Sequence, residues 1–168
     1  GSAIAIGTNA GKITQYNNSI AIGSNAGFTS QNSNSIAIGD SAGYNFQSNN
    51  SIALGFNAGY SNQFSGAIAI GSNAGYTSQN FFTVAIGTNA GYTGQKTSAI
   101  AIGSNTGNLG QGQDAIAIGT SAGSSSQGIR AIAIGSNAGT MGQGTGAIAI
   151  GTTAGNTCLL YTSPSPRD

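Results

Sequence analysis

Residues 19–27 read SIAIGSNAG, and this stretch decides the fold because close variants of it recur throughout the chain. Its two glycines return every sixteen residues without exception; the first series begins at Gly7 and the second at Gly11. The residues between the second glycine and the next apolar run vary freely, so the fixed positions are informative. A fixed period of this length indicates a repeat protein in which each unit packs on its neighbours.

Each unit contains one short strand pattern, AIAIG, with a period of two and a glycine at its end. The Asn-Ala-Gly that follows in most units is typical of a turn in which glycine takes a positive φ. One such strand cannot bury its apolar face alone, but coils stacked in register can. We therefore predict an all-β fold, a β-solenoid or β-roll of ten 16-residue coils over residues 1–157. At a strand spacing of about 4.8 Å the rod would be about 48 Å long.

Stacking would turn each sequence column into a ladder. The isoleucine columns that begin at Ile4 and Ile6 would form an apolar spine on one face, which we expect stacking to bury. The residue between them is alanine in all ten units, from Ala5 to Ala149, and alternation places it on the opposite face. An exposed face would have drifted to Thr, Ser or Lys. We therefore expect the alanine face to pack closely against another chain or another sheet, which predicts self-association into an oligomer or filament.

Two amide columns accompany the strands. Glutamine recurs every sixteen residues from Gln15 to Gln143, and we expect its amides to hydrogen-bond along the rod; a row of amides that binds a ligand is the alternative. Asparagine is expected to serve the turns because it tolerates the left-handed region. This column comprises Asn9, Asn25, Asn57, Asn73, Asn89, Asn105 and Asn137.

The units SIAIGSNAG (19–27) and SIAIGDSAG (35–43) resemble the head repeats of trimeric autotransporter adhesins, which run like SVAIGxxSxA. The resemblance implies a left-handed β-roll with three chains around one axis, on a cell surface. The glycine-rich AIGxNAG units are also similar to repeats in fibre proteins of phages and large DNA viruses. This chain differs from the adhesins in its longer period and in its glutamine column.

The composition argues against several function classes. Charged residues make up 4% of the chain and the net charge is +1, so there is no electrostatic footprint for nucleic acid. No apolar run is long enough for membrane insertion of this segment. With no histidine, Ser-His and Cys-His catalysis is impossible and the commonest metal ligand is missing. Asp40 and Asp114 lie between four and five coils apart, about 20 Å, too far for paired-carboxylate chemistry. We expect no enzyme, no catalytic residue, no metal site and no cofactor.

Two features could meet a partner at the surface. One column holds five consecutive aromatic residues, which could simply pack along the rod or could form a stripe that binds glycans, another fibre or a host surface. These are Phe28, Tyr44, Tyr60, Tyr76 and Tyr92. Asn17 and Asn49 head Asn-Asn-Ser sequons two coils apart, and are candidate glycosylation sites.

Three functions fit these columns. The favoured one is a structural repeat segment of an extracellular fibre, on a cell or virion surface, that self-associates as a trimer or fibril and is adhesin-like. An amyloid-like filament of solenoids stacked end to end is the second. An ice-binding solenoid is the third; its nearest ladder begins at Thr8 and Ser24, but Asp40 and Phe56 interrupt it.

Residues 158–168 break the period. Leu159 stands where a glutamine is required, and Pro164 and Pro166 stand where a strand is required. The peptide CLLYTSPSPRD looks like the in-frame translation of a transposase end and adapter used in preparing DNA sequencing libraries. We therefore interpret this tail as a sequence artefact and expect the natural protein to extend beyond both ends of residues 1–157.

Overall fold

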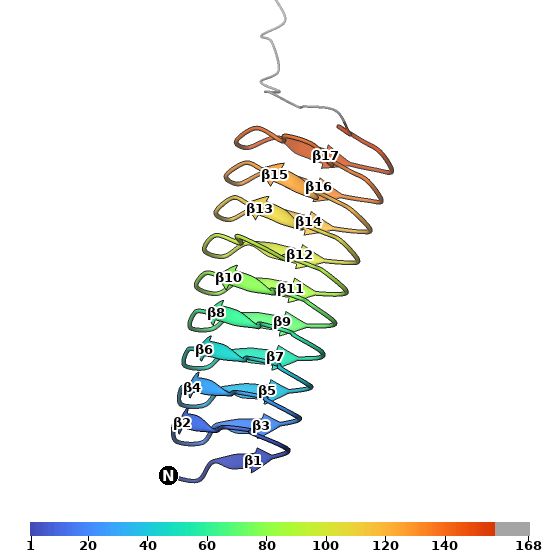
Figure 1. Cartoon of the computed structure of the whole chain (residues 1–168). Coiled ribbons are helices and arrows are strands. Elements are labelled where there is room, and N and C mark those ends of the chain that lie inside the picture. Colours follow the sequence, from blue (N-terminus) through green and yellow to red (C-terminus); the bar gives the residue numbers. More distant parts are fainter. Residues whose placement is uncertain (157–168) are drawn as a thin grey trace, which may run out of the picture.

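The computed structural model describes residues 1–156, and in them the chain winds into a β-solenoid whose coils follow one another in sequence order (Figure 1). The predicted all-β class is confirmed, since these residues contain strands and turns and no helix. Successive coils pair sixteen residues apart, so one repeat makes one coil and the described residues make about nine turns. The interpretation of residues 158–168 concerns a segment outside the described residues.

One side of the rod is a ten-stranded parallel sheet built from the Ile-Ala-Ile motif. Its strands pair in strict register, so that Ile4 lies beside Ile20 and Ala5 beside Ala21. The strands are β1 (Ile4–Ile6), β3 (Ile20–Ile22), β5 (Ile36–Ile38), β7 (Ile52–Leu54), β9 (Ile68–Ile70), β11 (Val84–Ile86), β12 (Ile100–Ile102), β14 (Ile116–Ile118), β16 (Ile132–Ile134) and β17 (Ile148–Ile150).

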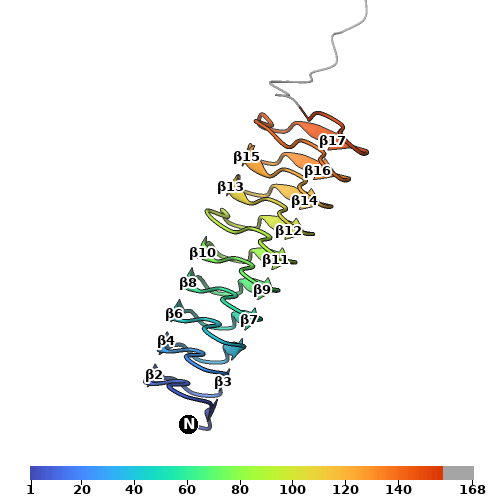
Figure 2. The same ribbon diagram turned by 45° about the vertical axis from the view of Figure 1, so that its right-hand side comes forward.

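A second row of strands runs beside the first along the rod, and Figure 2 shows the two rows joined by loops. It comprises β2 (Ile13–Gln15), β4 (Thr29–Gln31), β6 (Asn45–Gln47), β8 (Ser61–Gln63), β10 (Thr77–Gln79), β13 (Leu109–Gln111) and β15 (Ser125–Gln127). The middle residue of these strands, such as Ser30 at φ +50°, is left-handed. Pairing therefore skips it and joins only the outer residues, as Gln15 with Gln31.

The turns need unusual backbone angles, which accounts for the fixed columns. Gly39 has φ +129°, and a Cβ there would lie 2.5 Å from the carbonyl oxygen of Gly55 in the next coil. Only glycine allows the backbones to stack so closely. The predicted role of the asparagine column in turns is confirmed: Asn73 has φ +53° and its Nδ2 donates to Oδ1 of Asn89 at 3.3 Å.

The interior of the coil is lined by alanine, and this corrects the expected arrangement. Ala21 and Ala26 are fully buried and belong to a continuous core of alanines from two columns. The close packing of the alanine face is confirmed, but it packs inside its own coil. The isoleucines were expected to be the buried face, and this was wrong: they point outward, and Ile38 remains 38% exposed.

The narrowness of the coil explains this inversion. A Cβ placed on Gly27 would lie 3.4 Å from Cβ of Ala21 and 2.7 Å from Oε1 of Gln31. The turn at Gly27, Ala21 of the first sheet and Gln31 of the second row therefore lie close together inside the coil. The methyl group of Ala21 and the flat amide of Gln31 fill the space between them. A branched isoleucine side chain pointing inward would overpack it.

Candidate functional site

The described part of the chain offers no cluster for metal chemistry. Within residues 1–156, no group of three or more His, Cys, Asp or Glu residues is placed to hold a metal ion. Residues 1–156 also contain no helix that is long and apolar enough to cross a membrane. The features that can carry a function are therefore the ladders that run along the rod, one inside it and the others on its surface.

The glutamine ladder lies inside the coil. Nε2 of Gln31 donates to the carbonyl oxygen of Ile20 at 2.7 Å and to Oε1 of Gln47 at 3.3 Å. The same pattern links neighbouring coils along the column, with amide-to-amide distances as short as 2.8 Å. Gln31 is fully buried, so these amides serve the fold and are sealed from a ligand in solution. The series is interrupted between Gln47 and Gln63, where Oε1 of Gln63 has no partner among the described residues.

The predicted aromatic column forms a continuous stack of half-buried rings. The centroids of Phe28 and Tyr44 are 4.9 Å apart with 2° between the ring planes, and the stack continues to Tyr92 at 5.0 Å spacing or less. At the first end, Nζ of Lys12 lies 5.4 Å from the centroid of Phe28, a cation–π contact. The rings cover one another's faces, so a flat ligand could stack only at the two ends.

Because the ring faces are stacked on one another, the ladder can offer a partner only the edges of its rings and the hydroxyl groups of its tyrosines. The hydroxyls of the four tyrosines make no hydrogen bond to any other residue within 1–156. Burial raises the pKa of the Tyr60 phenol, and the neighbouring Tyr76 and Tyr44 raise it further. The ladder therefore presents a row of hydroxyl groups along the rod.

The two sequons lie where a sugar could point away from the rod, since Asn17 and Asn49 are exposed. The serines of the motif are not: Ser19 and Ser51 are fully buried, and Oγ of Ser19 donates to the carbonyl oxygen of Tyr16 at 2.6 Å. A transferase that needs the free hydroxyl would have to act before the coil closes. Glycosylation remains a prediction.

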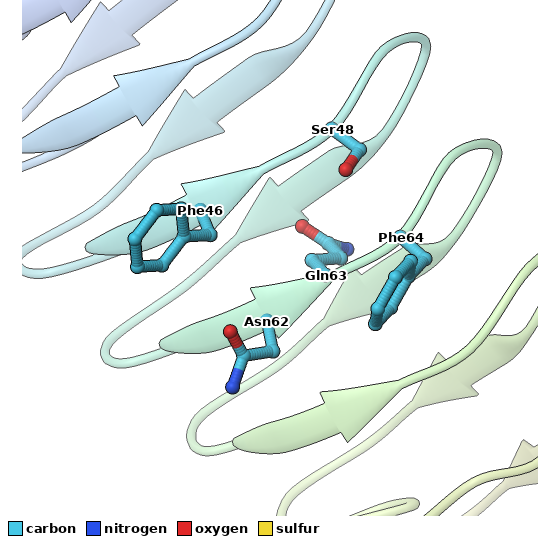
Figure 3. Close-up of a pocket in the computed structure, with 5 residues that line it drawn as sticks. All are labelled: Phe46, Ser48, Asn62, Gln63 and Phe64. Atoms are coloured by element: carbon cyan, nitrogen blue, oxygen red, sulfur yellow. The ribbon is translucent and has the colours of Figure 1, made fainter.

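Sequence analysis missed a cluster of exposed phenylalanines on coils in the middle of the rod. Phe46 and Phe82 are 60% and 66% exposed, and Phe64 and Phe81 lie 5.2 Å apart by ring centroid. A hollow of about 240 Å³ lies between Phe46 and Phe64, with Gln63 between the two rings (Figure 3). The signal for this cluster was the appearance of phenylalanine in columns that elsewhere hold mostly small or polar residues.

The backbone is strained at Phe46 and at Phe82. Their φ angles are +54° and +57°, a region that bulky side chains rarely adopt. The energetic cost of such a conformation is about 1–3 kcal/mol for each residue. Exposed aromatic side chains are thus held at positions where the fold would accept glycine more easily.

The outward isoleucines form the longest apolar surface of the rod. Two parallel columns run over all ten strands of the first sheet, from β1 to β17, and no charged residue stands within them. The most exposed members lie at the two ends; Ile6 is 59% and Ile150 65% exposed. Contiguous apolar patches of this kind mark interaction surfaces in soluble proteins.

The comparison with protein families agrees with the repeat pattern. Two copies of the YadA head domain repeat match residues 111–138, which contain β14 and β16. The resemblance to adhesin head repeats is thereby confirmed, and the β-solenoid fits it. The matched repeat is an adhesin-type structural unit and not that of an enzyme. No curated protein and no solved structure matches the chain significantly.

Proposed function

We propose that this chain is the repeat segment of a surface fibre in which copies associate through the isoleucine face. The observation that carries the proposal is the outward pair of aliphatic side chains on all ten strands, isoleucine everywhere except at Leu54 and Val84, which no other strand of the described residues covers. The YadA head repeat supports an adhesin-like, extracellular role. Neither the amyloid-like filament nor the ice-binding alternative receives support from the comparisons.

A second copy is the partner that fits this face best. The isoleucines repeat at the spacing of parallel strands, about 4.8 Å, and only a surface with the same period can interdigitate along the full rod. Completing the burial of an isoleucine that is about one third exposed, as Ile38 and Ile118 are, stabilises by roughly 0.5–1 kcal/mol, and the less exposed members contribute less. Summed over two columns, this is of the same order as the association cost of about 4–15 kcal/mol. The family resemblance favours three chains around one axis.

The test is the mass of the chain in solution, measured by light scattering and sedimentation. We expect a trimer, and we expect the double variant Ile68→Lys/Ile100→Lys to dissociate, because it buries two charges in the seam. The matched control, Ser61→Lys/Thr77→Lys, places two charges on the second row of strands and should keep the mass. A stable monomer of the unchanged chain would contradict the proposal, whereas long filaments would favour end-to-end growth.

The aromatic ladder supports a second candidate role, adhesion to glycans or to a host surface. Because ring faces are occupied, contact would use the ring edges and the four tyrosine hydroxyls. Replacing Tyr44, Tyr60, Tyr76 and Tyr92 by Phe keeps the stack and removes the hydroxyls. Binding to a panel of immobilised glycans should fall for this variant, and unchanged binding would rule out a hydroxyl-mediated role.

A further inference from the structure

We infer that the tyrosine ladder is a site of oxidative modification, at which phenols on successive coils couple to dityrosine and join the coils covalently. The residues are Tyr44, Tyr60, Tyr76 and Tyr92. The inference goes beyond the proposed self-association, because it concerns links within one chain.

The geometry places equivalent atoms of neighbouring phenols close together. The planes of Tyr44 and Tyr60 differ by 2°, so the two rings are related almost by a pure translation of 4.9 Å. Each carbon beside a hydroxyl group therefore lies at about that distance from its counterpart in the next coil. Tyr60–Tyr76 and Tyr76–Tyr92 have similar spacings, 4.9 and 5.0 Å, with 12° and 5° between their ring planes. Coupling requires the two half-buried side chains to rotate until these carbons come into bonding contact.

The chemistry requires an external oxidant, which we take to be hydrogen peroxide acting through a peroxidase-type one-electron catalyst. Each phenol loses one electron and one proton and becomes a neutral phenoxyl radical. Two radicals form a carbon–carbon bond between the ring positions beside the hydroxyls, and loss of the ring hydrogens to the oxygens restores both aromatic rings. In total two phenols lose two hydrogen atoms, and one hydrogen peroxide is reduced to two waters.

The surroundings of the ladder favour this outcome over competing oxidations. The chain contains no tryptophan and no histidine, its one cysteine is Cys158 in the non-repeat tail, and Met141 lies three coils beyond the coil of Tyr92. Phe28, at one end of the stack, extends the packing but carries no phenol. Tyr16 lies in a different column and has no stacked neighbour among residues 1–156. The link would run along the rod axis, so it would resist separation of one coil from the next.

Two matched variants test the inference. Tyr76→Phe/Tyr92→Phe leaves Tyr44 and Tyr60 on adjacent coils, whereas Tyr60→Phe/Tyr92→Phe leaves Tyr44 and Tyr76 two coils apart, about 10 Å. Both keep every ring of the stack and the same number of phenols, including Tyr16 and Tyr161. Circular dichroism before oxidation establishes that each variant is folded.

Each full-length protein is treated at low concentration with peroxidase and hydrogen peroxide. Dityrosine fluorescence, the loss of two hydrogen atoms from the intact mass, and peptide mapping then report the product. We expect a Tyr44–Tyr60 link within one chain, at a yield several-fold higher in the adjacent-pair variant than in the separated-pair variant. Equal yields in the two variants, or links that map only between chains or to Tyr16, would overturn the inference.

Discussion

The side chain of Gln31 crosses the interior of its coil and ties the two rows of strands together. Its Nε2 lies 2.7 Å from the carbonyl oxygen of Ile20, which stands on the opposite row eleven residues earlier. The same nitrogen lies 3.3 Å from Oε1 of Gln47 in the next coil. One buried amide therefore holds the coil closed and joins it to its neighbour, in a core that otherwise contains small side chains, mostly alanine.

Replacing this amide should destabilise the rod. Gln31→Leu keeps the approximate volume but leaves Oε1 of Gln47 without its donor, while the Ile20 carbonyl keeps its partner in the sheet. A buried unpaired group costs about 1–3 kcal/mol, so we expect the free energy of unfolding in urea to fall by about that amount. The matched control is Gln113→Leu, at an exposed position outside the column. Equal effects at the two positions would show that the ladder contributes nothing specific.

Mutation can distinguish a glycine required by close contact with the next coil from a glycine required only by its positive φ. Gly39→Ala places a Cβ 2.5 Å from a backbone oxygen of the next coil, so the coils must move apart. Gly110→Ala also has a positive φ, +71°, but its Cβ would meet nothing within 4 Å. Gly110→Ala should cost only the backbone penalty of about 1–2 kcal/mol. Gly39→Ala should cost clearly more in thermal unfolding, and a smaller loss at Gly39 than at Gly110 would argue against close backbone stacking.

Relief of backbone strain should be measurable at Phe82. Because its φ of +57° suits glycine, Phe82→Gly should leave the free energy of unfolding unchanged or raise it by up to about 1 kcal/mol. Phe81→Gly is the control; Phe81 has no positive φ and its ring packs against that of Phe64 in a tilted arrangement, so its replacement should destabilise. A marked loss of stability in Phe82→Gly would mean that packing of the ring outweighs the strain.

The aromatic ladder predicts a loss of stability in alkaline solution. Burial raises the pKa of Tyr60 above its ordinary value of 10.0. The folded state then binds the phenol proton more tightly than the unfolded state, so stability is unaffected below pH 10 and falls as the pH rises beyond it. Unfolding curves at several pH values up to 11 should show this fall, and Tyr60→Phe should reduce it. An identical pH profile for the two proteins would rule out the contribution of Tyr60.

The repeat pattern was sufficient to predict most of the fold. In a stack of coils with one repeat each, residues sixteen apart must be neighbours, so the pairing of Ile4 with Ile20 and of Phe28 with Tyr44 could be expected before any coordinates. The phenylalanine cluster could not be predicted in this way. Phe46 lies in the second row of strands, whereas Phe64 and Phe82 lie in the loops that follow it, and only the path of the chain shows how near such different columns come to one another.

The sequence by itself determined the period, the turns and the identity of each ladder, because these depend on local backbone preferences and on register alone. Alternation also required Ala21 and Ile20 to point to opposite faces, but it could not decide which face is inside. The tertiary structure decides which of the two faces lies inside. The tight turns bring Gly27, Gln31 and Ala21 so close that the interior accepts only small side chains and planar amides. The larger isoleucines are therefore left on the outside, where they form the surface through which the fibre is proposed to assemble.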